Sequence, residues 1–146
     1  MEYLLKSAYL YKICNSVSWL NPNQQFVISI YGENSNGGVI KIPGEKLINN
    51  QSVIIRHITK VSEMNSTNAL FICDSEIGRL ESILKEVRGK NIMTFADAEG
   101  FGKRGVMVNF LVRKNKVVYS LNRTSLAKAG FVLPNQIVSA AYQISY

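Results

Sequence analysis

The sequence predicts an α/β fold: one three-layer domain over residues 1–146, with helices on both faces of a mixed, mostly parallel sheet of about six strands. Two observations lead to this class. First, the segment 69–95 has the order strand, helix, strand, which is typical of a βαβ unit with parallel strands and a right-handed crossover. Second, the apolar segments 106–112 and 117–121 are only four residues apart. That is too close for a parallel crossover, so they indicate a C-terminal antiparallel hairpin.

The N-terminal half begins with an expected helix over 2–19, in which apolar residues recur near the helical spacing. These residues are Leu10, Ile13, Cys14 and Val17. The nearly continuous apolar segment 25–31 is typical of a strand covered on both faces. We expect a polar turn region over 32–38, then a short helical turn over 44–49 and a strand over 52–58.

The C-terminal half contains the predicted βαβ unit and two further helices. Asp74 or Ser75 would cap the helix of that unit, and Gly89 would end it. The apolar face of this helix is expected to contain Ile77, Leu80, Leu84 and Val87. Two short helices, over 124–129 and 134–144, would complete the domain. The second would face the core with Ile137, Ala141 and Ile144.

A glycine-rich loop follows the predicted strand 92–95. Its sequence, Gly100-Phe101-Gly102-Lys103-Arg104-Gly105, matches the G-x-G-x-x-G pattern of dinucleotide-binding sites. Such a motif must open a helix, whereas 106–112 is β-branched and strand-like, and no acidic residue stands about 20 residues further on. The glycines are therefore interpreted as turn residues between two strands.

The net charge of +7 is unevenly distributed. Residues 1–78 contain six basic and six acidic residues, whereas residues 79–146 contain eleven basic and four acidic ones. A basic surface can meet an acidic protein surface, anionic lipid headgroups or phosphates, or it can be a solvated face. Nucleic acid is not expected as a partner, because the chain has no recognisable helix-turn-helix or zinc module and no aromatics interleaved with the basic residues.

Cysteine and histidine usage predicts no metal, no cofactor and no catalytic site. Cys14 and Cys73 are 59 positions apart, and the single histidine, His57, has no evident partner, which excludes the spacing of a zinc site. The two cysteines are interpreted as small core residues. A disulfide between them, or a cysteine-dependent redox sensor, is the alternative if the protein is exported.

Two carboxylates stand at the end of the strand 92–95, where open α/β sheets bind ligands. Asp97 and Glu99 could therefore belong to a site. In the alternative interpretation Asp97 has a capping and turn role, and Glu99 pairs with Lys103 or Arg104.

The order of short segments along nearly the whole chain is a further pattern. The segments are the helix ending in Trp19, the strands 26–32, 53–56 and 70–72, Asp97, Gly100-Phe101, Arg104 to Phe110, Leu121-Asn122 and Ala127 to Gly130. In this order and spacing they resemble the YfiR/HmsC-like family of bacterial periplasmic regulatory proteins. Members often have a cysteine just before the strand that matches 70–72, where this chain has Thr67, so a family disulfide does not carry over.

The resemblance implies a non-enzymatic periplasmic regulator that binds the periplasmic part of an inner-membrane signalling protein. In the best-known members this represses a diguanylate cyclase, and so cyclic di-GMP synthesis. It also implies a homodimer. The N-terminus lacks the features of a secretory signal, so the leader peptide is expected to be absent from this chain. No apolar segment approaches the roughly 18 residues of a membrane span, so no direct membrane insertion is expected.

The glycine-rich loop is the expected contact surface, and the first helix is the expected dimer element because aromatic residues suit protein contacts. The expected partner- or ligand-binding residues are Asp97, Glu99, Phe101, Lys103 and Arg104. The expected dimer-helix residues are Tyr3, Tyr11 and Trp19, although these rings could also simply cover the sheet. The alternative function is a periplasmic small-ligand receptor with a pocket at the strand ends, where Arg104 would pair with an anionic group.

Overall fold

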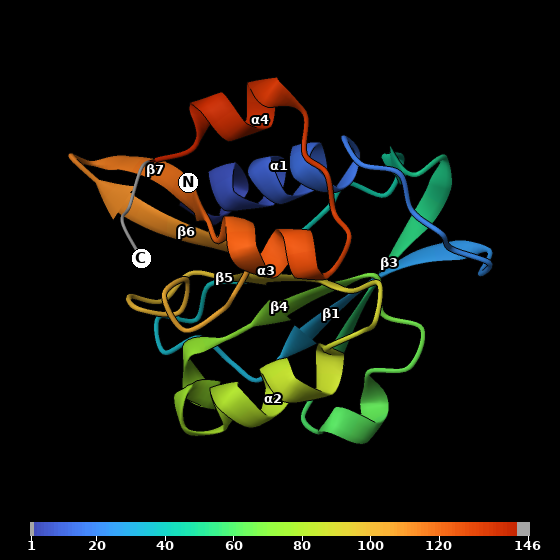
Figure 1. Cartoon of the computed structure of the whole chain (residues 1–146), viewed down its shortest axis with the longest axis horizontal. Helices are drawn as coiled ribbons and strands as arrows, with labels where there is room; N and C mark the ends of the chain where they lie inside the picture. The colour runs from blue at the N-terminus through green and yellow to red at the C-terminus, as the bar shows by residue number, and fades with distance from the viewer. Residues whose placement is uncertain (1, 143–146) are drawn as a thin grey trace.

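Within residues 2–142, which the computed structural model describes, the chain forms one seven-stranded sheet with helices on both faces (Figure 1). The strand order is β2-β3-β1-β4-β5-β6-β7. The strands are β1 (Gln25–Tyr31), β2 (Leu47–Ile48), β3 (Gln51–Ile58), β4 (Ala69–Ile72), β5 (Met93–Ala96), β6 (Val108–Arg113) and β7 (Lys116–Leu121). The inner pairs are parallel, and the edge strands β2 and β7 are antiparallel to their neighbours. The predicted α/β class, with its mostly parallel sheet and C-terminal hairpin, is confirmed.

The helices form the two outer layers. They are α1 (Glu2–Cys14), α2 (Leu80–Val87), α3 (Arg123–Lys128) and α4 (Asn135–Ala140), with short 3₁₀ segments η1 (Val61–Glu63) and η2 (Asp74–Arg79). Three of them, α1, α3 and α4, lie on one face of the sheet, and α2 lies on the other (Figure 1). Among the described residues, no helix combines the length and the apolar character that crossing a membrane requires.

The core consists of two apolar clusters, one on each face of the sheet. Side chains alternate along a strand, so β1 contributes to both clusters. Phe26 and Ile28 pack in one cluster with Leu10 of α1, whereas Tyr31 packs in the other with Leu80 of α2. Six of the seven residues of β1 are buried, which agrees with the prediction of a strand covered on both faces.

The first helix ends at Cys14, so the prediction that it extends to Trp19 is wrong. The chain turns after Cys14 and brings the Trp19 ring back, and the indole Nε1 donates a hydrogen bond of 2.7 Å to the Cys14 carbonyl. The ring is buried edge-on against Phe26 and Phe131, with centroid distances of 5.0 and 5.2 Å. Burial against these two rings requires the chain to leave the helix, and it outweighs the local helical pattern.

The predicted helical turn over 44–49 is also wrong, because this segment contains a turn and then the edge strand β2. β2 pairs with β3 through a two-residue hairpin whose central residues, Asn49 and Asn50, have φ values of 55° and 59°. Asparagine tolerates this left-handed backbone better than most residues, which makes it a typical residue of such turns. Two adjacent asparagines were the signal for a strand that was not predicted.

The helix of the βαβ unit has a different apolar face from the one predicted. Its first part is the 3₁₀ segment η2, which contains a kink at Glu76, and only the second part is α-helical. The kink shifts the periodicity, so Ile77 is 57 % exposed rather than part of the core. Leu80 and Val87 are buried as predicted, and Ile83 occupies the core as well.

The C-terminal elements agree in part with their prediction. The helix expected over 124–129 is α3, and Asn122 caps it by accepting a hydrogen bond of 3.0 Å from the Ser125 amide. The helix expected over 134–144 ends at Ala140. Ile137 is buried as predicted, and Ile144 lies outside the described residues.

The predicted C-terminal hairpin is formed by β6 and β7, and it turns at Lys114-Asn115. Both residues have positive φ values, 52° and 63°, which is the backbone of a two-residue type I′ turn. The hairpin therefore has a fixed register, in which Arg113 lies opposite Lys116.

Gly38 provides a test of how α1 is seated on the sheet. A Cβ atom at this position would lie 1.8 Å from Cε2 of Tyr3, so we expect Gly38→Ala to displace the Tyr3 ring and lower the free energy of unfolding by about 1–3 kcal/mol. Gly44→Ala is the control, because no atom lies within 4 Å of its Cβ position. Urea denaturation of the two variants checks this, and equal midpoints would contradict the expectation.

Candidate functional site

The β5–β6 loop, residues Asp97–Met107, connects two parallel strands by successive turns, without a helix. The turns are closed by backbone hydrogen bonds, among them the Val106 amide to the Phe101 carbonyl at 3.1 Å. Gly100 and Gly105 have φ values of 82° and 122°, a backbone that side chains rarely adopt. The glycine motif opens no helix here, so its interpretation as turn residues is confirmed at these two positions.

Two asparagine side chains, from Asn109 of β6 and from Asn122 at the start of α3, hold the β5–β6 loop in place. The side-chain Nδ2 of Asn109 donates a hydrogen bond to the Ala98 carbonyl, and the side-chain Nδ2 of Asn122 donates one to the Gly102 carbonyl, both at 2.8 Å. From the interior, Phe101 fixes the loop with a side chain that is only 1 % exposed. Phe101 is therefore a core residue under the loop, although it was expected to contact a partner or a ligand.

Asp97 lies at the carboxyl end of β5, beneath the first turns of α1. Its side chain is 3 % exposed, and it forms an ion pair of 3.0 Å with Lys6, whose side chain is 4 % exposed. It also accepts a hydrogen bond from the Tyr3 hydroxyl, and Lys6 forms a second ion pair with Glu2. Asp97 therefore connects α1 to the sheet, which differs from both the surface role and the turn role considered for it.

Sequence reasoning missed Lys6 as the partner of Asp97, although a signal was present. Lys6 lies between Tyr3 and Leu10 at spacings of three and four residues, on the face of the helix that contains the apolar residues. A lysine at a core-facing position is almost never buried without a counter-charge. That position predicts a buried carboxylate from elsewhere in the chain.

The polar cluster around Tyr3 extends into the segment 32–38 and covers the carboxyl end of the sheet. Asn34 donates to the Tyr3 hydroxyl at 3.1 Å and accepts from the Asp74 amide at 3.2 Å. Burial, together with the hydrogen bond to Asp97, raises the pKa of the Tyr3 phenol well above its usual value. The phenol therefore remains a donor, and this part of the edge, where open α/β sheets often bind ligands, is filled by the protein's own side chains.

Three of the predicted site residues remain at the surface: Glu99, Lys103 and Arg104. Glu99 does not pair with either neighbour, as had been considered. It accepts two hydrogen bonds from the Arg113 guanidinium of the hairpin, at 2.9 and 3.3 Å. This ion pair places the loop beside the hairpin, where both lie at one end of the sheet (Figure 1). Together the exposed Lys103, Arg104, Lys114 and Lys116 form what we call the basic surface.

The aromatic residues of α1 mainly face inward. Tyr9 packs against Phe110 and Tyr119 with centroid distances of 6.4 and 5.3 Å. Tyr11 is half-buried, and Trp19 lies outside the helix in the core. These rings cover the sheet, and the residues that α1 exposes most among its large apolar side chains are Leu4 and Leu5.

Both cysteines are buried free thiols, so the interpretation as small core residues is confirmed and the disulfide is not formed. Burial raises the pKa of the Cys14 thiol. Burial also raises the pKa of Cys73 to about 12, with Asp97 as the next cause. A thiol that stays protonated and inaccessible is a poor nucleophile and a poor redox sensor.

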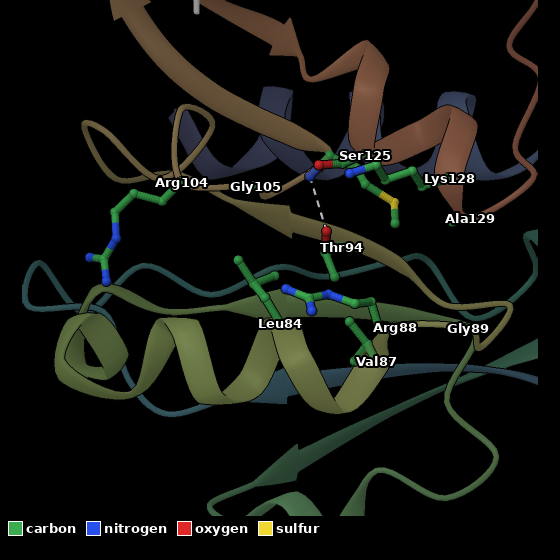
Figure 2. Close-up of a pocket in the computed structure, with 11 residues that line it drawn as sticks. Leu84, Val87, Arg88, Gly89, Thr94, Arg104, Gly105, Ser125, Lys128 and Ala129 are labelled. Atoms are coloured by element: carbon green, nitrogen blue, oxygen red, sulfur yellow. Dashed lines mark hydrogen bonds between the residues drawn. The ribbon is translucent and has the colours of Figure 1, made fainter.

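A cavity of about 160 Å³ lies between α2 and α3 (Figure 2). Arg104 contributes to its wall from the β5–β6 loop. The other lining residues come mainly from the end of α2, from the starts of β5 and β6 and from α3. The cavity therefore lies near the amino ends of β5 and β6, whereas a ligand pocket was expected at the carboxyl ends of the strands.

The buried ion pair gives a stability prediction. We expect Asp97→Asn to lower the free energy of unfolding by roughly 3 kcal/mol, because the Lys6 ammonium stays buried without this carboxylate. The double variant Lys6→Met/Asp97→Asn should cost less than the sum of its two single changes. Glu99→Gln is the control, because its 75 % exposed side chain forms a surface pair worth at most about 1 kcal/mol. Additive costs in urea denaturation would exclude the coupling.

The cysteines give a reactivity prediction. At pH 8 the folded protein should react with a thiol reagent such as DTNB far more slowly than the urea-unfolded protein, in which both thiols become accessible. Absorbance of the released thiolate measures this. Fast reaction of either thiol in the folded protein would revive the redox-sensor alternative.

Comparison with known proteins agrees with this architecture. No curated protein matches the chain. A similar solved structure is that of a conserved domain protein from Vibrio cholerae O1 biovar El Tor N16961, with a TM-score of 0.60 and 9 % identity. The match covers 95 % of this chain and 58 % of the other, so this chain spans little more than half of the length of that protein. At this identity the likeness concerns the fold alone.

A family model supplies the identity. It covers residues 3–142, which include α1, the whole sheet, the β5–β6 loop and the C-terminal helices. The match therefore includes the segments whose order suggested the resemblance. The chain belongs to the YfiR/HmsC-like family.

Proposed function

We propose that this protein is a non-enzymatic periplasmic regulator that binds the periplasmic part of an inner-membrane signalling protein. The observation that carries the proposal is the family match over residues 3–142, since membership supports a regulatory rather than a catalytic role. By the same resemblance the partner would be a diguanylate cyclase, and binding would lower cyclic di-GMP synthesis.

The basic surface supports a contact with an acidic partner. Lys103, Lys114 and Lys116 are exposed, and within residues 2–142 none of them forms an ion pair with a carboxylate. Val112 beside them is 45 % exposed and offers an apolar contact. Charges that are free of internal partners can steer and orient an oppositely charged protein. Asp97 and Phe101 would act on this contact only indirectly, by holding the loop.

The proposal includes a homodimer. Leu4 and Leu5 are 68 % and 45 % exposed on α1, so the outer side of this helix has apolar residues for a contact between copies. Sedimentation of the purified protein at several concentrations measures its association.

An affinity pull-down from envelope extract of the native host tests the regulator function. The tagged protein should retain an inner-membrane protein with a periplasmic sensor domain and release it at high salt, because exposed charges are screened. Mass spectrometry identifies what is retained. A clean, monodisperse protein that retains nothing would argue against this function.

Charge reversal tests the basic surface. Lys103→Glu/Arg104→Glu should weaken binding to the partner by roughly tenfold or more and reduce its dependence on salt. Lys85→Glu/Lys90→Glu is the matched control, because it changes the net charge equally in the region of the C-terminal end of α2. Equal affinities of the two variants would remove the β5–β6 loop from the interface.

A second candidate function is a small-ligand receptor. One observation favours it: the cavity between α2 and α3, whose wall includes Arg104, the residue expected to pair with an anionic group. This cavity lies at the starts of β5 and β6, whereas the ligand pocket was expected at the carboxyl ends of the strands.

A further inference from the structure

The cavity between α2 and α3 combines basic side chains with a lining that contains no acidic residue. Its basic members are Arg88, Arg104 and Lys128. We propose that this cavity is a binding site for a phosphate-type oxyanion, either inorganic phosphate or a small phosphate monoester. The inference deepens the second candidate function and does not depend on the regulator function.

Two of the cations approach the cavity from opposite layers of the protein. Arg88 follows the last turn of α2, and Lys128 is the last residue of α3 (Figure 2). Neither side chain forms an ion pair or a hydrogen bond to a carboxylate within residues 2–142. Arg104 lies at the far side, where it donates to the Ile77 carbonyl at 3.4 Å. The site therefore has positive charge that no internal partner neutralises.

Thr94 adds a buried donor to the cavity. It is 0 % exposed, and its Oγ1 accepts a hydrogen bond of 3.0 Å from the Met107 amide. Among the described residues its hydroxyl hydrogen has no acceptor, and the side chain stands in the wall of the cavity (Figure 2). The half-buried Ser125 contributes a second hydroxyl to the lining from the α3 side. A buried hydroxyl hydrogen without an acceptor indicates a missing acceptor, and an anion's oxygen is one.

The size of the cavity suits a phosphate group with a small organic substituent. A cavity of about 150 Å³ holds a molecule the size of benzene, and this one has about 160 Å³. Gly105 keeps it open, since a Cβ atom there would lie 3.3 Å from Leu84. The donors come from Arg88 after α2, from α3 and from β5, and a phosphate group has enough oxygens to accept a hydrogen bond from each of them.

The test is a titration of the purified protein with inorganic phosphate at constant ionic strength, followed by NMR of the backbone amides. We expect saturable shifts centred on Thr94, Gly105 and Ser125. The variant Arg88→Gln/Lys128→Gln should lose roughly tenfold or more in affinity, because charge-assisted hydrogen bonds are the strong ones in such a site. Both altered side chains are exposed, so the variant should retain its melting temperature.

A matched variant separates a built site from general positive charge. Arg123→Gln/Lys60→Gln removes one exposed arginine and one exposed lysine that do not line the cavity, and it should bind phosphate as the unaltered protein does. Equal losses in the two double variants, or shifts that never saturate, would overturn the proposal.

A second arm identifies the source of the phosphate. A soluble phosphate monoester such as glycerol 3-phosphate should compete with inorganic phosphate. Vesicles containing phosphatidylglycerol would compete instead if the group belongs to a lipid headgroup. Because the titration contains no partner protein, a negative result leaves the regulator function untouched, and a failed pull-down leaves the oxyanion site untouched.

Discussion

The connection between β5 and β6 is the constraint on which most of this structure depends. Parallel neighbours usually need a crossover built on a helix, but residues Asp97–Met107 make the link with turns alone. The buried backbone groups of such a loop need hydrogen-bond partners, because water does not reach them. Asn109 and Asn122 supply them for the loop carbonyls, and Thr94 supplies one for the Met107 amide. With the loop held in this way, the positions of the hairpin, the basic surface and the cavity wall are fixed as well.

Burial separates the structural residues of this region from those that can meet another molecule. The Asp97 carboxylate and the Phe101 ring face inward, where they tie the loop to α1 and to the core. Lys103 and Arg104, which follow Phe101 within three positions, are exposed. A substitution at Asp97 should therefore mainly change the stability of the fold, whereas a substitution at Lys103 should mainly change binding to a partner.

Arg104 belongs to both proposed sites. It is exposed with the basic surface, and it also forms part of the wall of the cavity between α2 and α3. An anion in the cavity would neutralise part of the positive charge that a partner meets. The two functions considered for this protein, partner binding and ligand binding, are thus compatible through a shared side chain, and any coupling between them would be reciprocal.

Short-range pattern was enough for much of the fold. The strand-helix-strand order of 69–95 predicted the α/β class, the short gap between 106–112 and 117–121 predicted the hairpin, and the order of segments indicated the family. The tertiary structure alone decided which loop residues are accessible. Lys6 and Asp97 are 91 positions apart, and the Trp19 ring packs against Phe131 from the other end of the chain, so no local window contains both members of either pair. Periodicity reports neighbours along the chain, whereas burial and pairing depend on contacts that only the folded chain creates.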